Sequence, residues 1–185
     1  LNIPAFAVSN KNELEKTTHL ILPGVGSFDW AIEKLNQSGL RENLDKLVIN
    51  QNIPILGICV GMQMMCLSSE EGNLDGLGWI DGTVKHFRNL IDTSHQNFEV
   101  PHMGWNSIEI KKKNKLLDKI GNNSRFYFLH SYYFSEKDSD IVMMQTDYID
   151  WFTSCFQKDN IIGIQFHPEK SHSMGIQLLN NFFKL

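Results

Sequence analysis

The sequence predicts an α/β protein with a mostly parallel sheet, helices on both faces, and an antiparallel β extension in its second half. Short apolar runs alternate with amphipathic stretches in the first half, and this β-α-β-α order is typical of parallel strands joined by helices. The second half is a succession of strand-like runs closed by one helical pattern. The length of 185 residues suits one domain with one sizeable core.

The first half alternates its elements in a regular order. The run "HLILP" is typical of a buried strand, and Ser27 is placed to cap the helix that follows. The next predicted elements are two helices, a strand and a third helix. Their residues are Phe28, Ala31, Ile32 and Leu35 on the apolar face of the first helix, Leu40, Leu44, Leu47 and Val48 on that of the second, Ile53 to Ile58 in the strand, and Met62, Met65 and Cys66 in the third helix.

The second half is predicted to be mainly strands. The candidates are "WIDGTVKHF", "NSIEI", "RFYFLHSYYF", "DIVMMQT" and "FTSCFQKDNIIGIQF", the last a hairpin that turns at Lys158, Asp159 and Asn160. A closing helix, capped by Ser171 or Ser173, carries Ile176, Leu179, Phe182 and Phe183. The stretch from Asn89 to Glu99 is the best candidate for a long loop.

Composition excludes several classes of protein. Apolar residues make up 42% and charged residues 21%, and no run approaches the ~18 apolar residues of a membrane span. The net charge of −4 and the lack of a basic stripe argue against a nucleic-acid partner. Three cysteines without CxxC spacing indicate neither a disulfide framework nor a zinc site, so we expect a cytoplasmic protein without metal or cofactor.

The stretch "ILGICVGMQMM" contains a candidate nucleophile, Cys59. Gly57 and Gly61 frame it as G-x-C-x-G, the thiol counterpart of the nucleophile elbow, in which a strained turn joins a strand to a helix. The helix after Cys59 would favour a thiolate, and the Val60 amide would point toward an oxyanion. The alternative on this motif alone is a buried structural thiol, which is our interpretation of Cys66 and Cys155.

A second motif, "GIQFHPEKS", contains a candidate base and its orienting carboxylate. Residues two apart in extended chain share a side, so His167 and Glu169 can face one pocket, and Pro168 biases His167 toward extended geometry. A surface turn is the alternative. Two other histidines, His102 and His130, can approach a pocket but have no carboxylate at matching spacing.

The turn "ILPGVGSF" follows the first predicted strand. It lacks the phosphate-loop and dinucleotide patterns, so we expect it to present backbone amides to a carbonyl group, with its two glycines allowing a peptide flip. A tight strand-to-helix turn without further function is the alternative.

Together these motifs resemble the class I (triad-type) glutamine amidotransferases, whose fold is flavodoxin-like. The residues that carry the resemblance are "LILPGVGSFDWAI", "PILGICVGMQMM", "VPHMGWNSI", "YFLHSYYF" and "IIGIQFHPEKS". Within the family the sequences of these motifs are most similar to those of the glutaminase subunits of imidazole glycerol phosphate synthase. The resemblance implies hydrolysis of glutamine to glutamate and ammonia, which a (β/α)8 barrel cyclase subunit uses in histidine biosynthesis.

The resemblance also implies a role for individual residues. By resemblance, Cys59 is the nucleophile, His167 the general acid and base, and Glu169 its orienter. The other implied residues are Val25 and Val60 at the oxyanion hole, Gly24, Gly26, Gln63, Ser131 and Tyr132 at the glutamine site, and Trp105, Asn106, Tyr127 and Lys170 at the interface with the barrel partner.

The resemblance leaves other functions open. A paralogous glutaminase could supply ammonia for amidation of a sugar precursor in surface polysaccharide synthesis. A scaffold with an inactive pocket, and a peptidase or γ-glutamyl hydrolase on the same fold, are further alternatives.

The start of the sequence departs from the family pattern. The family begins with a strand, a glycine-containing loop and a helix that nothing after Leu1 matches. We therefore expect residues 1–185 to be a single amidotransferase domain that lacks the first strand and most of the first helix, with further residues upstream in the native protein or a truncated gene product.

Overall fold

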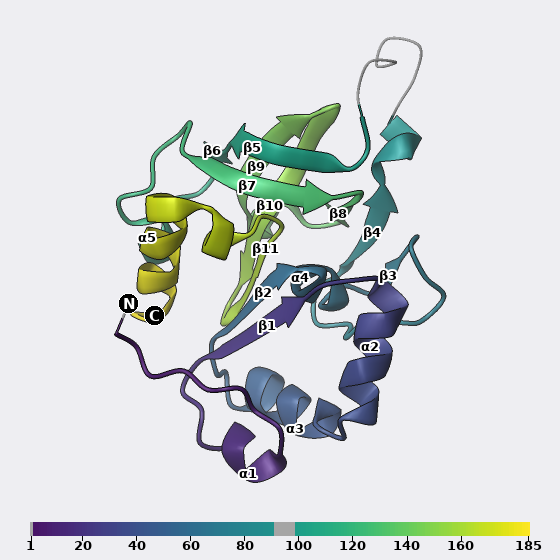
Figure 1. Ribbon diagram of the computed structural model, residues 1–185, viewed down its shortest axis with the longest axis vertical. Helices are drawn as coiled ribbons and strands as arrows, with labels where there is room; N and C mark the ends of the chain where they lie inside the picture. Colours follow the sequence, from purple (N-terminus) through teal and green to yellow (C-terminus); the bar gives the residue numbers. More distant parts are fainter. Residues whose placement is uncertain (1, 91–98) are drawn as a thin grey trace.

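The structure, a computed structural model, describes residues 2–90 and 99–185. Within these residues a nine-stranded mixed sheet has the strand order β1-β2-β11-β10-β8-β4-β3, with β9 paired to β10 and β6 to β9. A separate two-stranded sheet, β5 and β7, lies beside β9 and β10 (Figure 1). The α/β fold with an antiparallel second half is therefore confirmed. Of the loop expected from Asn89 to Glu99, residues 91–98 lie outside the described residues, and Asn89 and Leu90 end a 3₁₀ helix (Phe87–Leu90) instead.

The strands of both sheets follow the chain in order. They are β1 (Leu20–Gly24), β2 (Ile55–Cys59), β3 (Ser68–Ser69), β4 (Gly82–His86), β5 (His102–Ser107), β6 (Glu109–Ile110), β7 (Arg125–His130), β8 (Tyr132–Glu136), β9 (Val142–Tyr148), β10 (Asp150–Lys158) and β11 (Ile161–Ile164).

Helices connect the strands of the first half and close the chain. The α-helices are α1 (Lys11–Leu14), α2 (Phe28–Gln37), α3 (Arg41–Asp45), continued by a π-helical turn (Lys46–Asn50), α4 (Val60–Met64) and α5 (His172–Phe182). Short 3₁₀ helices are η2 (Phe87–Leu90), η3 (Lys115–Leu117), η4 (Ser139–Ile141) and η5 (Pro168–Lys170). In Figure 1, α2 and α5 lie on either side of β1, β2 and β11.

The parallel part of the sheet determines where the motifs meet. Strand β2 pairs in parallel with β1 on one side and with β11 on the other, which places Gly24 beside Cys59 and Ile164 beside Ile58. Gln165, the residue after β11, is therefore level with Cys59. The carboxyl ends of parallel strands are where open α/β sheets bind ligands, so this edge is the expected place for a site.

Several local predictions need correction. The run "RFYFLHSYYF" is two strands in different sheets, because the chain leaves β7 at His130 and enters β8 at Tyr132. Helix α4 ends at Met64, so Cys66 lies just beyond it, although it is fully buried. Ile176 of α5 faces solvent, and Leu178 takes the buried position.

The caps of α2 also differ from the prediction. Ser27 is the N-cap residue of α2, but its side chain makes no capping hydrogen bond. The Phe28 amide instead donates to Glu71 Oε2 at 2.8 Å. A carboxylate from a distant loop thus satisfies this helix terminus, which a local cap pattern does not reveal.

The G-x-C-x-G turn is held by close backbone contacts. A Cβ on Gly61 would lie 1.8 Å from the carbonyl oxygen of Leu22, and one on Gly24 would lie 2.4 Å from the Gly61 nitrogen. A Cβ on Gly57 would lie 2.8 Å from the Gly61 oxygen. Helix α4 therefore starts directly against β1, and these glycines are required by packing as well as by the geometry of the turn.

We predict that Gly61→Ala lowers the free energy of unfolding by about 3 kcal/mol or more, because the Leu22 carbonyl belongs to a paired strand and cannot move away. Denaturant unfolding followed by circular dichroism measures this loss. Gly121→Ala is the matched control, since a Cβ there meets nothing within 4 Å, and it should change stability by no more than about 0.5 kcal/mol. Equal stability of the two variants would contradict the packing argument.

Candidate active site

A cavity of about 260 Å³ opens at the carboxyl ends of β2 and β7. Cys59 lines it together with residues from the following helix and from the junction between β7 and β8. The lining residues are Gly26, Cys59, Val60, Gln63, Glu71, Pro101, Leu129, His130, Ser131 and Tyr132. Six residues that the sequence proposed for the site, Gly26, Cys59, Val60, Gln63, Ser131 and Tyr132, are thus brought together.

Other predicted residues lie outside the lining of this cavity. Gly24 packs against Val60 and Gly61 instead. The side chain of Val25 is 70% exposed, on the turn between β1 and α2. His167 and Glu169 belong to the segment that follows β11 and do not line the cavity either.

Cys59 occupies a strained backbone position. It lies at φ 54° and ψ −113°, in a region that side-chain-bearing residues rarely adopt, and α4 begins at the next residue. Its side chain is only 6% exposed. This is the geometry expected of a nucleophile elbow, and neither Cys66 nor Cys155 has it.

Burial raises the pKa of the Cys59 thiol to about 11. A hydrogen bond from the Val60 amide lowers that pKa, the charge of Glu169 raises it, the side-chain amide of Gln165 lowers it, and the charge of Glu71 raises it. The thiol is therefore protonated at neutral pH, and the helix terminus alone does not make it a thiolate.

His167 and Glu169 form the predicted pair. His167 Nδ1 lies 2.8 Å from Glu169 Oε1, and His167 is extended at φ −99° and ψ 99°. Its amide donates to the Tyr127 carbonyl at 2.9 Å, which anchors the segment to β7. Because a carboxylate accepts, Nδ1 is the donor in this contact, and Nε2 is the ring nitrogen on the other side.

Two residues near the cavity were not identified from the sequence. Glu71 lines the cavity and also receives the Phe28 amide. Gln165 connects Gln63 to Cys59: it accepts from Gln63 Nε2 at 3.1 Å and donates to Cys59 Sγ at 3.7 Å. The signal for Glu71 was an acidic pair after a short strand, and the signal for Gln165 was a polar residue at the end of an apolar strand. Both patterns are common in proteins, so neither indicates a site by itself.

A buried pair of histidines forms the wall behind the cavity. His102 Nδ1 lies 3.1 Å from His130 Nε2, and His130 Nδ1 lies 2.7 Å from the Tyr132 carbonyl. Burial lowers the pKa of His102 to about 4 and that of His130 to about 3. Each ring is therefore neutral, and because the carbonyl can only accept, His130 donates from Nδ1 and His102 donates to His130. Asn106 Nδ2 then donates to His102 Nε2 at 3.2 Å.

The two faces of the β5 and β7 sheet differ in character. Register pairs Met103 with Leu129 and Trp105 with Tyr127, so these four side chains share the outer face. The Trp105 and Tyr127 rings lie 6.2 Å apart, and Lys170 Nζ lies 5.5 Å from the centre of the Tyr127 ring. These three expected interface residues thus form one cluster.

Asn106 does not belong to this cluster. It shares the inner face with His102, and its side-chain amide donates to the Asp147 carbonyl at 3.0 Å as well as to His102. Its amide is therefore committed within the protein rather than presented on the outer face.

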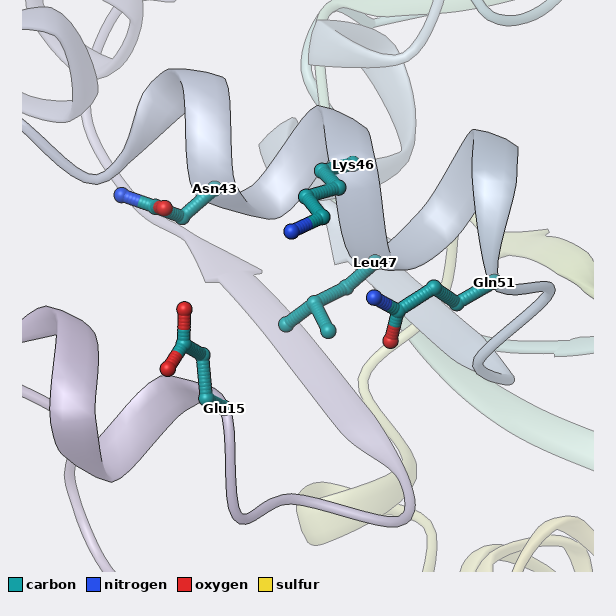
Figure 2. A pocket seen from close by; sticks show the side chains of 5 residues that line it. All are labelled: Glu15, Asn43, Lys46, Leu47 and Gln51. Atoms are coloured by element: carbon teal, nitrogen blue, oxygen red, sulfur yellow. The ribbon is translucent and has the colours of Figure 1, made fainter.

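Figure 2 shows a second cavity, also of about 260 Å³, near α1 and α3. It is lined by Glu15, Asn43, Lys46, Leu47 and Gln51. It contains neither a thiol nor an imidazole, so we place the candidate site at the Cys59 cavity. Within residues 2–90 and 99–185, no three His, Cys, Asp or Glu side chains gather as metal ligands, and no helix there is long and apolar enough to span a membrane.

Comparison with known proteins identifies the family. A family model described as glutamine amidotransferase class-I matches residues 3–185. The chain belongs to the class-I glutamine amidotransferases. A solved structure described as a glutamine amidotransferase shares the fold of this amidotransferase with a TM-score of 0.72 and 18% identity, covering 98% of this chain and 86% of that one.

Curated relatives lie much closer in sequence. The amidotransferase is 49% identical to the imidazole glycerol phosphate synthase subunit HisH of Leptospira interrogans, over 100% of this chain and 90% of the relative. It is 48% identical to the subunit HisH 2 of Methanococcus maripaludis, over 100% of this chain and 89% of that relative.

We predict that alkylation of Cys59 by iodoacetamide in the free amidotransferase rises about tenfold per pH unit between about pH 7 and about pH 10, because only the thiolate reacts and its pKa is about 11. Quenching the reaction at a series of times, followed by peptide mapping by mass spectrometry, measures the rate. Cys66 and Cys155, both fully buried, serve as internal controls and should stay unlabelled. A rate that levels off below about pH 8 would show that the resting thiol is already acidic.

Proposed function

We propose that this chain hydrolyses glutamine to glutamate and ammonia, and that the ammonia passes to a (β/α)8 barrel cyclase subunit that makes imidazole glycerol phosphate in histidine biosynthesis. The observation that carries the proposal is Cys59, a strained elbow cysteine lining a cavity at the sheet edge where His167 and Glu169 also lie. The names of the relatives at 48–49% identity support the choice of acceptor.

The polar groups of the cavity suit an amino acid with a terminal amide. The carboxylate of Glu71 provides negative charge for an ammonium group. Both protons of Gln63 Nε2 are used by Tyr132 and Gln165, which leaves Gln63 Oε1 as an acceptor for a substrate N–H group. Gly26, Ser131 and Tyr132 complete the proposed contacts.

The proposed mechanism has an acylation step and a hydrolysis step, and His167 transfers the proton in both. His167 Nε2 takes the thiol proton of Cys59 as the sulfur attacks the carboxamide carbon of glutamine, forming a tetrahedral intermediate. His167 returns the proton to the departing nitrogen, which leaves as ammonia and produces a thioester. Water, deprotonated by His167, then hydrolyses the thioester to glutamate and restores the thiol. Glu169 holds the imidazole and stabilises its charged form.

The oxyanion of the intermediate needs hydrogen-bond donors near Cys59. The Val60 amide already points at the sulfur, and the Val25 amide is the proposed second donor, after a peptide flip that Gly24 and Gly26 permit. We propose that this flip waits for the partner subunit, which keeps hydrolysis low in the free chain.

The outer face of β5 and β7 is the proposed docking surface. Met103 is 66% exposed and Trp105 38% exposed, an apolar area of the kind that proteins use for association. Leu129 of the same face also lines the cavity. Ammonia released at Cys59 would therefore emerge next to the bound partner rather than into open solvent.

We predict that glutamate forms rapidly only when the chain is mixed with the barrel cyclase subunit of the same organism, and that Cys59→Ala abolishes it because no nucleophile remains. A coupled glutamate assay with and without the cyclase measures both effects. Cys155→Ala, which removes a buried thiol of β10 that does not line the cavity, is the matched control and should retain activity. Equal turnover with and without the cyclase would contradict the partner dependence. If the gene did not restore growth of a histidine auxotroph, the proposed use of the ammonia in histidine biosynthesis would be contradicted.

We further predict that Val25→Pro lowers kcat in the complex about 100-fold, because proline has no amide proton to donate to the oxyanion. Val25→Ala keeps the amide and changes only an exposed side chain, so it should retain most of the activity. Steady-state kinetics in the complex separates the two. A loss shared equally by both variants would assign the effect to the side chain instead.

A further inference from the structure

We propose that Gln165 is a positioning residue for Cys59, whose side-chain amide donates a hydrogen bond to the sulfur and favours the thiolate. The inference deepens the proposed function and rests on Cys59 being its nucleophile. It is carried by the contact between Gln165 Nε2 and Cys59 Sγ, 3.7 Å long and formed by residues 106 positions apart.

The orientation of the Gln165 amide follows from its neighbours. The Tyr132 carbonyl can only accept, so the Gln63 atom 3.1 Å away must be Nε2. Gln63 Nε2 also lies 3.1 Å from Gln165, whose facing atom must then be the acceptor Oε1. Nε2 of Gln165 is left to face Cys59 Sγ, so the group directed at the sulfur is a donor.

The first acceptor in this series is itself held in place. The Tyr132 carbonyl receives the proton of His130 Nδ1 as well as the Gln63 amide, which fills both of its lone pairs. Gln165 is 0% exposed, and its backbone amide donates to the Ser154 carbonyl at 3.0 Å. The donor is thus fixed by the sheet and by buried neighbours before any substrate arrives.

A donor at this position opposes the influences that raise the pKa of the Cys59 thiol. Burial disfavours the charged sulfur, and the carboxylates of Glu169 and Glu71 repel it. A hydrogen bond to a charged acceptor is stronger than one to a neutral acceptor, so the Gln165 amide stabilises the thiolate more than the thiol. Together with the Val60 amide it makes deprotonation by His167 less costly.

The experiment measures Cys59 alkylation in the full chain for wild type and Gln165→Met, which keeps the length of the side chain but removes the donor. We expect the rate constant of the variant to be about tenfold lower at every pH between about 7 and about 10. Iodoacetamide and the smaller reagent methyl methanethiosulfonate should be slowed by the same factor, because both report the thiolate fraction. Unequal factors would indicate a change in access and overturn the proposal, as would unchanged rates.

Ser154→Ala is the matched control. It alters the neighbouring strand at a hydroxyl that has no hydrogen-bond partner within the described residues, and it should leave both rates unchanged. If Gln165→Met does not fold, the side-chain amide resonances of Gln165 in the wild-type chain decide the question. They should shift when Cys59 is alkylated, and resonances that do not respond would overturn the proposal.

The outcome is independent of the glutaminase assay. Alkylation reports the acidity of the thiol whether or not glutamine is a substrate. A chain that shows the expected alkylation profile but forms no glutamate with the cyclase would refute the proposed function and leave the role of Gln165 intact.

Discussion

The parallel pairing of β2 with β1 and with β11 is the constraint on which the candidate site depends. It places the end of β1, the cysteine turn and the segment after β11 at one edge of the sheet. The contact between Gly61 and the Leu22 carbonyl then fixes α4 against β1, which leaves Cys59 in a conformation with positive φ at the start of the helix. The strain of that conformation is maintained by the packing of two strands and a helix around it.

The same packing creates a chemical difficulty. A site that excludes water disfavours the thiolate, as the raised pKa of Cys59 shows. Two donors next to the sulfur offset part of this cost: the Val60 amide from the helix and the Gln165 amide from the neighbouring strand end. The Leu129 carbonyl, 3.8 Å from Sγ, accepts from the thiol and does not favour the thiolate. In the proposed mechanism His167 meets the remaining cost by taking the proton at Nε2, while its Nδ1 faces Glu169.

Hydrogen bonds run in one direction from the inner face of β5 toward the cavity. Asn106 donates to His102, His102 to His130, and His130 to the Tyr132 carbonyl, on which the Gln63 amide also converges. The Tyr132 carbonyl can only accept, and it therefore sets the proton position of His130 and, through it, that of His102. The opposite face of the same two strands carries the exposed Trp105 and Met103. Because successive side chains of β5 point to opposite faces, the strand has an exposed apolar face on one side and a buried polar network on the other.

Local patterns were enough to predict much of this protein. The glycines around Cys59, the spacing of His167 and Glu169, and the alternating order of strands and helices are properties of neighbouring residues, and glycine requirements and strand periodicity act over a few positions. The sequence thereby determined the fold class, the elbow and the His167 to Glu169 hydrogen bond.

Tertiary structure decided what depends on distant segments. Whether Gln165 touches the sulfur, whether Glu71 caps α2 and faces the cavity, and whether Asn106 points inward all depend on strand register and on loops far away in the chain. The burial that makes Cys59 a weak acid is likewise a property of the assembled core, because desolvation sums over every neighbour of the thiol and no short pattern encodes that sum.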